Sequence, residues 1–506
     1  MTERVLIRRL PTGVPGLDDV LGGGLPEFSF NLIAGAPGSG KTTLVHQIMF
    51  ALARPDRPAL VFTVLGEPPL KMLRYQQQFT FFDVAKVNAS VRFINLGQEA
   101  LNAGLGEVLK RISEEVEATS PGVVIVDSFR SVGRVAKRQN GPLDLQRFVQ
   151  ELAMRLTGWQ ATTFLVGEYQ LSESEDNPVF TVADGLLWLY QSIDRNSMVR
   201  KMQVMKLRGQ APIPGLHTFR ITDNGVQVFP RLIIGPEGTR APGAAGKTKR
   251  HLPRLSIGVK GVDDMLGGGI PSGHSVLVAG PSGSGKTVLA TQFISEGARH
   301  GEPGVIAVFE KRPSEYAQTS SSAFDQLVRN GQVGIIHTRP LDLSIDETLH
   351  DLTRAIQRLK ARRVVIDSLS GFELALAPTF REDFRESLYR LVAVLTGMGI
   401  TMLMTTELEN SYIDLRFSPH GTAFLTDAII LQRYVELQGQ LTRVMAVVKV
   451  RASAHSKELR RFEIGDRGIV VGERVDNYEG LLTGSPQLIR SASPLPRPPD
   501  KRRPKS

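Results

Sequence analysis

The chain of 506 residues exceeds the roughly 250–300 residues at which a single hydrophobic core stops growing, so we expect two large domains. Hydrophobic residues make up 41% and charged residues 22% of the sequence, and no segment approaches the roughly 20 apolar residues that span a bilayer, which argues against a membrane protein. The sequence contains no cysteine, which excludes disulfides and thiolate metal sites and favours a cytoplasmic location.

The net charge of +10 is concentrated in two segments of the sequence. Residues 234–254 carry +4 and residues 486–506 carry +5, so the rest of the chain is nearly neutral. Both segments are rich in Pro, Gly or Ser and cannot bury a core, which predicts a solvated linker and a disordered tail. Because the folded bodies carry little of the basic charge, we do not expect nucleic acid as a partner. A contact between the tail and an acidic protein partner stays open.

Two motifs occur twice at one spacing. Residues 13–26 read GVPGLDDVLGGGLP and residues 258–271 read GVKGVDDMLGGGIP, 245 positions later. GAPGSGKT at 35–42 recurs as GPSGSGKT at 280–287 with the same offset. The sequence therefore predicts a duplicated domain. We expect the first domain at 1–234, a basic linker at 235–253, the second domain at 254–485 and the tail at 486–506.

Short apolar runs alternate with longer helical patterns in each copy. Runs of Val, Ile and Leu without alternation are typical of strands buried on both faces of a parallel sheet. We therefore expect an α/β fold, two tandem domains that each hold a mostly parallel sheet covered by helices. The expected strands are 31–34, 59–64, 123–126 and 162–166 in the first copy, and 275–279, 305–309, 363–366 and 401–404 in the second.

The pattern G-x-x-x-x-G-K-T is the phosphate-binding P-loop, and it follows an apolar strand in both copies. Its glycines let backbone N–H groups point at phosphate oxygens, the next helix adds the positive end of its dipole, and the lysine reaches the β- and γ-phosphates. ATP is therefore the expected ligand of both copies. The expected nucleotide-binding residues are Gly35, Gly38, Ser39, Gly40, Lys41, Thr42 and Thr43 in the first copy, and Gly280, Gly283, Ser284, Gly285, Lys286 and Thr287 in the second.

A magnesium ion is the expected companion of each ATP. The P-loop hydroxyls of Thr42 and Thr287 supply one ligand, and an acidic residue at the end of a buried strand is expected to hold the ion from the other side. Asp127 ends the apolar run VVIV and Asp367 ends VVI, each downstream of its P-loop. The four expected metal residues are therefore Thr42, Asp127, Thr287 and Asp367.

These residues resemble the KaiC group of the RecA-like ATPases. The resemblance rests on the LDDVLGGGLP and VDDMLGGGIP openings, on the two P-loops, and on a K-x-R sequence near the end of each copy, KLR at 206–208 and KVR at 449–451. It extends roughly over residues 9–473. It implies a RecA-like fold and a hexamer of two stacked rings, with ATP at the boundaries between subunits.

The same resemblance implies a role for the K-x-R residues. In that family the lysine and arginine reach the nucleotide of the neighbouring subunit, so Lys206, Arg208, Lys449 and Arg451 are the expected trans contacts. A cation from a neighbour stabilises the charge on the transferring phosphoryl group, and hydrolysis would then require assembly. The alternative is that these residues are solvated ends of an edge strand.

The catalytic carboxylates depart from the family pattern. The family carries two adjacent glutamates after the second strand, where one acts on the attacking water. The second copy keeps only Glu310, and the first has Leu65 and Gly66 at the two positions. Glu67 substitutes if Gly66 lets the strand end bulge. Otherwise the first copy binds ATP and turns it over very slowly.

The residues for autophosphorylation also depart from the pattern. In circadian KaiC, adjacent Ser and Thr hydroxyls before an I-T-D segment accept phosphate, and here Ala423 and Phe424 precede Leu425-Thr426-Asp427. Phosphorylation at nearby Thr422 or Thr426 stays open. Two further glutamates, Glu168 and Glu407, close strands and are either nucleotide sensors or structural carboxylates.

Three functions follow from these features. The leading hypothesis is a slowly hydrolysing ATPase that forms a hexameric switch read by an unknown protein partner through the tail. The second is an autophosphorylating serine/threonine kinase of the KaiC type. The third is a DNA-strand motor related to RecA and ring helicases, against which the neutral bodies and the lack of an aromatic-basic stripe weigh.

Overall fold

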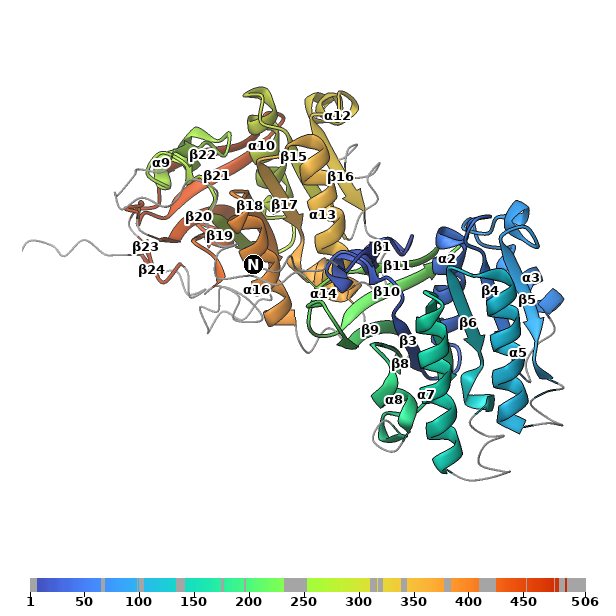
Figure 1. Cartoon of the computed structure of the whole chain (residues 1–506). Coiled ribbons are helices and arrows are strands. Elements are labelled where there is room, and N and C mark those ends of the chain that lie inside the picture. The colour runs from blue at the N-terminus through green and yellow to red at the C-terminus, as the bar shows by residue number, and fades with distance from the viewer. Residues whose placement is uncertain are drawn as a thin grey trace, which may run out of the picture. The chain divides into compact units, whose positions relative to one another are not determined.

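The computed structural model describes residues 7–64, 69–97, 99, 104–132, 142–173, 177–194, 197–231, 253–309, 316, 322–337, 344–376, 384–408, 425–451, 453–476, 478–481 and 487–488. These residues fall into two compact units, one before Ile234 and one after it. Each unit contains a nine-stranded sheet with helices packed on it (Figure 1).

The sheet of the first unit has the order β11-β10-β9-β8-β3-β7-β6-β4-β5. From β5 to β8 neighbouring strands are parallel, and β9, β10 and β11 continue the sheet in antiparallel pairs. The strands are β3 (Phe30–Gly35), β4 (Ala59–Thr63), β5 (Val91–Asn95), β6 (Val123–Asp127), β7 (Thr162–Glu168), β8 (Gly185–Asp194), β9 (Ser197–Leu207), β10 (His217–Thr222) and β11 (Gly225–Phe229).

Helices cover both faces of this sheet and bury separate cores. Leu32 of β3 packs in a core with α5 (Gly104–Thr119) and α7 (Pro142–Gly158), whereas its neighbour Ile33 packs in a core with α1 (Leu17–Leu21) and α2 (Lys41–Leu52). Successive side chains of a strand point to opposite faces, so a strand covered on both sides must be apolar throughout. Within the described residues this unit also has the helices α3 (Pro69–Gln76), η1 (Val84–Lys86), η2 (Leu171–Glu173) and α8 (Pro178–Val182).

The second unit repeats this topology strand for strand, in the order β16-β15-β17-β18-β14-β19-β20-β21-β22. Its strands are β14 (Ser275–Gly280), β15 (Gly304–Val308), β16 (Val333–His337), β17 (Arg363–Asp367), β18 (Thr401–Glu407), β19 (Ala428–Leu437), β20 (Gln440–Val450), β21 (Arg460–Gly465) and β22 (Gly468–Arg474). Its helices are α9 (Lys260–Met265), α10 (Lys286–Arg299), α12 (Ser322–Arg329), α13 (Ile345–Leu359), α14 (Leu369–Ala375) and α16 (Phe384–Gly397).

Short two-stranded sheets flank the two large ones. β1 (Arg9–Leu10) pairs with β2 (Leu25–Pro26), and β12 (Arg254–Leu255) pairs with β13 (Ile270–Pro271). The end of each repeated glycine-rich motif therefore pairs with a short strand that precedes the motif. β23 (Tyr478–Glu479) pairs with β24 (Gln487–Leu488). Within the described ranges, no helix has the length and apolar character needed to cross a membrane.

The predicted fold class is confirmed, since both sheets are mostly parallel and lie between helices. All eight expected strands lie within or overlap the observed strands β3, β4, β6 and β7, and β14, β15, β17 and β18. The antiparallel strands at one edge of each sheet did not emerge from the sequence. In these strands buried residues alternate with more exposed ones, as in β9. One face of the sheet is less fully covered there, so the strands lack the uninterrupted apolar runs by which the other strands were predicted.

Candidate nucleotide-binding sites

The P-loops connect a central strand to a helix in both units. In the first, β3 ends at Gly35 and α2 begins at Lys41, with Gly40 in the left-handed region at φ 98°. A Cβ atom at Gly40 would lie 2.5 Å from Cδ1 of Ile221 on β10, so both backbone angle and space require glycine there. Gly285 of the second unit repeats this, with φ 102° and a Cβ position 2.7 Å from Cδ1 of Ile464.

Both P-loop lysines fold over their own loop. Lys41 Nζ donates to the carbonyl oxygens of Gly35 at 3.0 Å and Ala36 at 2.7 Å. Lys286 Nζ donates to the carbonyl oxygens of Gly280 and Pro281, each at 2.8 Å. Burial lowers the pKa of Lys41, and the carboxylates of Glu168 and Asp127 oppose that shift. Each ammonium group is therefore held at the mouth of the loop, where a phosphate would replace the carbonyl oxygens as its partner.

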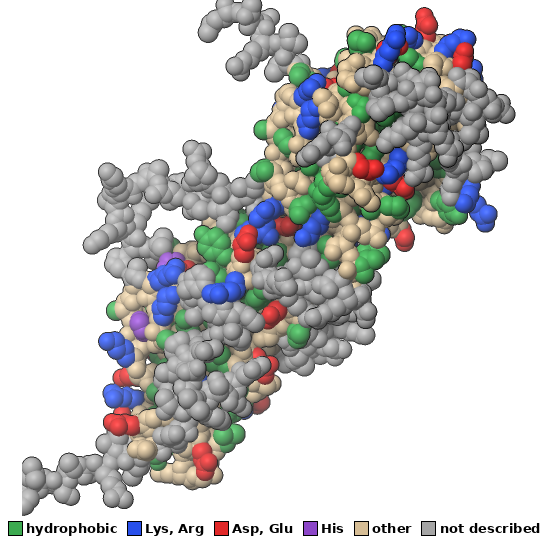
Figure 2. All heavy atoms as spheres, turned by 90° about the horizontal axis from the view of Figure 1, so that it is seen from below, with side chains coloured by type: hydrophobic (Ala, Val, Ile, Leu, Met, Phe, Trp, Pro, Cys, Tyr) green, Lys and Arg blue, Asp and Glu red, His purple; other side chains and the backbone are tan. Residues whose placement is uncertain are grey.

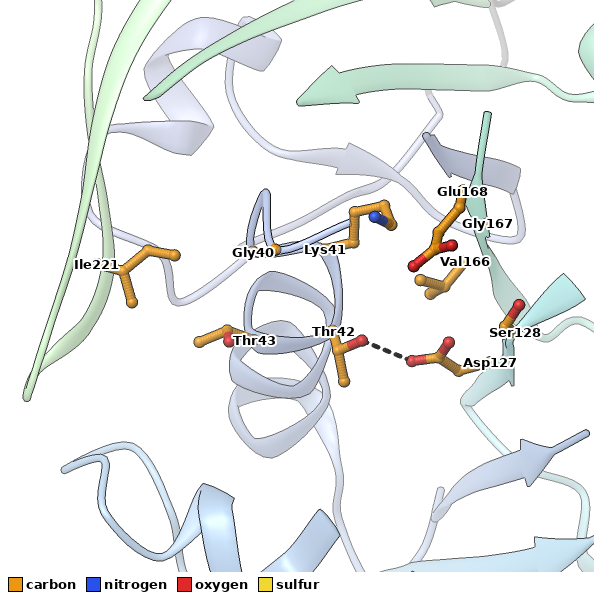
Figure 3. A pocket seen from close by; sticks show the side chains of 11 residues that line it. Gly40, Lys41, Thr42, Thr43, Asp127, Ser128, Val166, Gly167, Glu168 and Ile221 are labelled. Carbon is orange, nitrogen blue, oxygen red and sulfur yellow. Dashed lines mark hydrogen bonds between the residues drawn. The ribbon is translucent and has the colours of Figure 1, made fainter. Parts of the chain in front are cut away.

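The expected metal residues of the first unit meet directly. Thr42 Oγ1 donates to Asp127 Oδ2 at 2.8 Å, as Figure 3 shows. Asp127 ends β6, which is separated from β3 by β7 alone, so the parallel strands bring the carboxylate to the edge where the P-loop lies. Burial raises the pKa of Asp127, while the Thr42 hydroxyl and the Lys41 charge lower it. A hydroxyl and a carboxylate at this distance fit a hard cation such as Mg²⁺.

A cavity of about 290 Å³ opens beside this pair (Figure 3). The sheet register places Glu168, at the end of β7, directly across from Gly35. In Figure 3 the Glu168 side chain points toward Lys41, with Asp127 next along the same wall. The cavity combines a glycine-rich cradle, a cation and a hydroxyl–carboxylate pair, a set of groups that fits a magnesium nucleotide. Its lining residues are Gly38, Gly40, Lys41, Thr42, Thr43, Asp127, Ser128, Val166, Gly167, Glu168 and Ile221.

The second unit holds its strand-end aspartate differently. Asp367 is buried and accepts hydrogen bonds from the hydroxyl of Tyr316 at 3.1 Å and from Thr405 Oγ1. Thr405 is the fifth residue of β18, and the fifth residue of β7 is Val166, which has no hydroxyl. A metal ion that enters the second site must therefore share this carboxylate with two hydroxyl donors. The two repeats are chemically unequal although their folds match.

The K-x-R residues of the first unit lie away from their own P-loop. Lys206 pairs with Leu186 on β8, and Arg208 forms an ion pair with Asp184 at 3.1 Å. The backbone N–H of Asp184 donates to the carbonyl oxygen of Phe30, the first residue of β3. The P-loop begins at the other end of that strand, five residues further on or roughly 17 Å at a strand's rise per residue. The structure therefore does not bring Lys206 or Arg208 to the cavity of their own unit.

The second unit repeats that arrangement at the end of β20. Lys449 Nζ donates to the carbonyl oxygen of Thr426 at 2.7 Å, and Arg451 pairs with Asp427 at 3.4 Å. Burial, and then the neighbouring arginine, lowers the pKa of both lysines. Arg208 and Arg451 keep 61% and 52% of their side chains exposed, so their guanidinium groups are accessible from outside the unit.

Several predicted residues lie outside the described part of the chain. These are Glu67, Glu310, Thr422, Ala423 and Phe424. Among the described ones, Thr426 is 1% exposed, and Glu407 ends β18 across from Gly280 as Glu168 does from Gly35. His217, which follows the first K-x-R, has both ring nitrogens engaged with backbone groups of Ile213 and Arg231, so its role is structural.

Some residues of the first cavity were not expected from the sequence. Ser128 follows β6, Gly167 comes after the apolar run of β7, and Ile221 lies in the FRIT sequence of β10. The repetition of Ile221 as Ile464, each touching the same P-loop glycine of its unit, was a signal available in the sequence. Together the strand order, the loops and the Thr42–Asp127 pair define a tandem P-loop protein of the RecA-like fold.

Comparison with known proteins narrows this class to a family. The sequence model of the ATPase family KaiC matches residues 10–233 and again residues 255–476. The chain is 27% identical over 499 residues to the circadian clock oscillator protein KaiC of Picosynechococcus sp., which covers 96% of this chain and 93% of that protein. For the same-named protein of Prochlorococcus marinus the identity is 28% over 501 residues, with 96% of each chain covered.

The protein of the same name from Synechococcus elongatus is 27% identical over 507 residues, covering 96% of this chain and 93% of its own. The family model matches both repeats and most of the chain. The chain therefore belongs to the KaiC family and is an ATPase. The resemblance drawn from the repeated motifs is confirmed.

Proposed function

We propose that this KaiC-family ATPase binds Mg²⁺-ATP in both repeats, hydrolyses it slowly and works as a hexameric, nucleotide-dependent switch. The observation that carries the proposal is the first cavity, where glycine backbone, Lys41 and the Thr42–Asp127 pair face one space. Bound Mg²⁺ would neutralise charge on the β- and γ-phosphate oxygens. Thr42 and Asp127, and Thr287 and Asp367 in the second repeat, would hold it. The backbone groups at 35–43 and 280–287 would hold the phosphates.

Assembly follows from the position of the trans residues. Arg208 lies at the opposite end of β3 from its own P-loop, and its guanidinium is more than half exposed. A cation accelerates phosphoryl transfer only when it reaches the transferring group. A ring in which each copy presents Lys206, Arg208, Lys449 and Arg451 to the nucleotide of the next copy satisfies that requirement. The rate of hydrolysis then depends on assembly of the ring, as expected for a nucleotide-dependent switch.

The two repeats have different proposed tasks. Glu310 keeps one carboxylate of the family's pair in the second repeat, so we assign it most of the hydrolysis, with Glu310 acting on the attacking water. The first repeat lacks a carboxylate at both positions, with Glu67 as the substitute in its sequence. We assign it mainly to nucleotide binding and assembly. The division at 1–234, 235–253, 254–485 and 486–506 belongs to the same proposal and is supported by the two compact units.

Two other functions fit less well. Autophosphorylation of the KaiC type lacks hydroxyls at Ala423 and Phe424, and Thr426 is buried. A DNA-strand motor would need a continuous basic surface. On the face drawn in Figure 2, Lys and Arg lie among acidic and hydrophobic side chains. A protein partner, met through the basic tail in the cytoplasm, is the better match to the sequence.

Native mass measurement tests the proposed assembly. With Mg²⁺ and ATP we expect a species of six times the 55.5 kDa chain mass, because ATP joins neighbouring copies. Removing Mg²⁺ with a chelator is expected to return the protein to smaller species, since the metal is part of the site. A single-chain mass at every nucleotide concentration would contradict the ring and with it the trans contacts.

A further inference from the structure

A second cavity lies next to the nucleotide cavity of the first unit. It also measures about 290 Å³, and the two cavities share Thr42, Asp127 and Ser128. The Thr42–Asp127 pair is therefore a common wall between them. The other lining residues are Thr63 at the end of β4 and Met72, Tyr75 and Gln76 on α3.

Gln76 lines this cavity and carries a buried acceptor atom that lacks a partner. The residue is 5% exposed, and its Oε1 atom is fully buried without a hydrogen bond. Leaving a buried acceptor unsatisfied is unfavourable, so native proteins normally supply such an atom with a donor, often an ordered water. The cavity is polar on its other side, where the Asp127 carboxylate and the hydroxyls of Thr42 and Ser128 lie. A water molecule has room here, and Asp127, Thr42 and Ser128 offer it partners. The Gln76 amide joins them when its side chain turns the buried Oε1 atom toward the cavity.

This cavity lies at the carboxyl end of β4, the strand that precedes the positions of the family's paired glutamates in the sequence. β4 lies beside β6, so the end of β4 faces the metal-binding end of β6. Two residues after Thr63 the sequence reads Leu65-Gly66, which offers no side-chain acceptor. Gln76 belongs to α3, the helix that follows β4 along the chain, and lines the same cavity. The next element therefore adds an amide side chain to the wall of this cavity.

We infer that Gln76 positions the attacking water for ATP hydrolysis in the first repeat, which deepens the proposed function and depends on it. The amide oxygen accepts a hydrogen bond from the water and turns a lone pair of the water oxygen toward the γ-phosphate in the neighbouring cavity. Glutamine plays this orienting part in other nucleotide hydrolases. A neutral amide does not take up a proton, so it orients the water without acting as a base. Slow turnover in the first repeat follows.

The chemical step is balanced without a further reactant. The water oxygen forms a bond to the γ-phosphorus, and the bond from the γ-phosphorus to the bridging oxygen breaks. That oxygen keeps the electron pair and leaves as part of ADP. Of the two water protons, one stays on the phosphate product and the other passes to solvent. Gln76 remains unchanged and accepts a hydrogen bond throughout.

The test uses the full chain carrying Glu310→Gln, which removes the second repeat's carboxylate and keeps its P-loop. In that background we compare Gln76→Leu, Gln76→Glu and the matched control Gln77→Leu, whose residue is exposed and adjacent. Lys41→Ala in the same background measures any turnover that does not come from the first site. Calorimetry with Mg²⁺ and a non-hydrolysable ATP analogue reports binding for every variant.

We expect Gln76→Leu to lower the first-site kcat by about tenfold or more, with KM and analogue binding unchanged, and Gln77→Leu to match the parent. Gln76→Glu is expected to raise kcat, since a positioned base contributes about 10²–10⁴, and to make kcat rise with pH through the new carboxyl's titration. Equal turnover in Gln76→Leu and Gln77→Leu, or no first-site turnover above Lys41→Ala, would overturn the inference.

Two readouts separate this inference from neighbouring explanations. Loss of analogue binding in the parent itself would reject the proposed function, whereas intact binding with unaffected turnover rejects Gln76 alone. Thermal unfolding of each variant shows whether a loss of turnover comes from a loss of stability instead of a loss of water positioning. If Gln76→Leu fails to fold, Gln76→Glu decides the matter by its pH profile, and a profile identical to that of the parent contradicts the assignment.

Discussion

Lys286→Ala is expected to remove most of the ATP hydrolysis of this protein, with a loss of about 10²–10³ in kcat. Lys286 is held over its P-loop by two carbonyl oxygens and is the cation that would face the β- and γ-phosphates of the second repeat. Because that repeat keeps Glu310, its loss should dominate the total. Phosphate release measured under saturating Mg²⁺-ATP checks the expectation.

Lys41→Ala is the matched variant in the first repeat. Lys41 makes the equivalent contacts to Gly35 and Ala36, so the two substitutions remove the same group from equivalent positions. We expect Lys41→Ala to weaken assembly in ATP. Because the second site depends on an arginine of the neighbouring chain, its hydrolysis should fall with the loss of assembled protein, but by less than in Lys286→Ala, which removes the second site's own cation. Equal activity in the parent and both variants would overturn the catalytic assignment of the two repeats.

Arg451→Ala is expected to slow turnover while leaving ATP binding intact. Arg451 pairs with Asp427 at 3.4 Å. The N–H of Asp427 donates to Ser275, the first residue of β14, whereas the P-loop follows the other end of that strand. A cation supplied by a neighbour acts on the charge that develops during transfer and adds little to ground-state binding. Arginine fingers contribute about 10³–10⁵ in rate, so kcat should fall on the order of 10³.

Two comparisons give that result its meaning. Arg474→Ala removes an arginine of β22 that forms surface ion pairs with Glu458 and Asp476, and should leave turnover unchanged. Mixing Arg451→Ala chains with Lys286→Ala chains should restore activity in part, because each supplies what the other lacks across a subunit boundary. Parent-like turnover in Arg451→Ala would reject its action in trans.

Residues with a fixed chemical pattern could be predicted from the sequence. The P-loops and the strands that end in Asp127 and Asp367 were recognised because spacing and uninterrupted apolar runs carry enough information. The duplication gave each assignment a second, independent occurrence. The meeting of Thr42 with Asp127 across 85 residues then follows from the parallel arrangement of β3, β7 and β6.

Residues whose role depends on packing could not be predicted in the same way. Gln76 is one of three consecutive glutamines, and only the packing of α3 decides which of them faces inward. Tyr316 and Thr405 donate hydrogen bonds to Asp367, and no sequence pattern indicates that these three residues meet. The separation of Arg208 from its own P-loop could be recognised only from the register of β8 and β9.

The central claim is that one chain offers two sites for Mg²⁺-nucleotide, and titration calorimetry with a non-hydrolysable ATP analogue tests it most directly. The account predicts two equivalents bound per parent chain, and one equivalent for Lys41→Ala or Lys286→Ala. Binding should disappear from the parent when Mg²⁺ is withheld, because Thr42 and Asp127 act through the metal. Absence of any heat of binding with the parent chain and Mg²⁺ present would contradict the account.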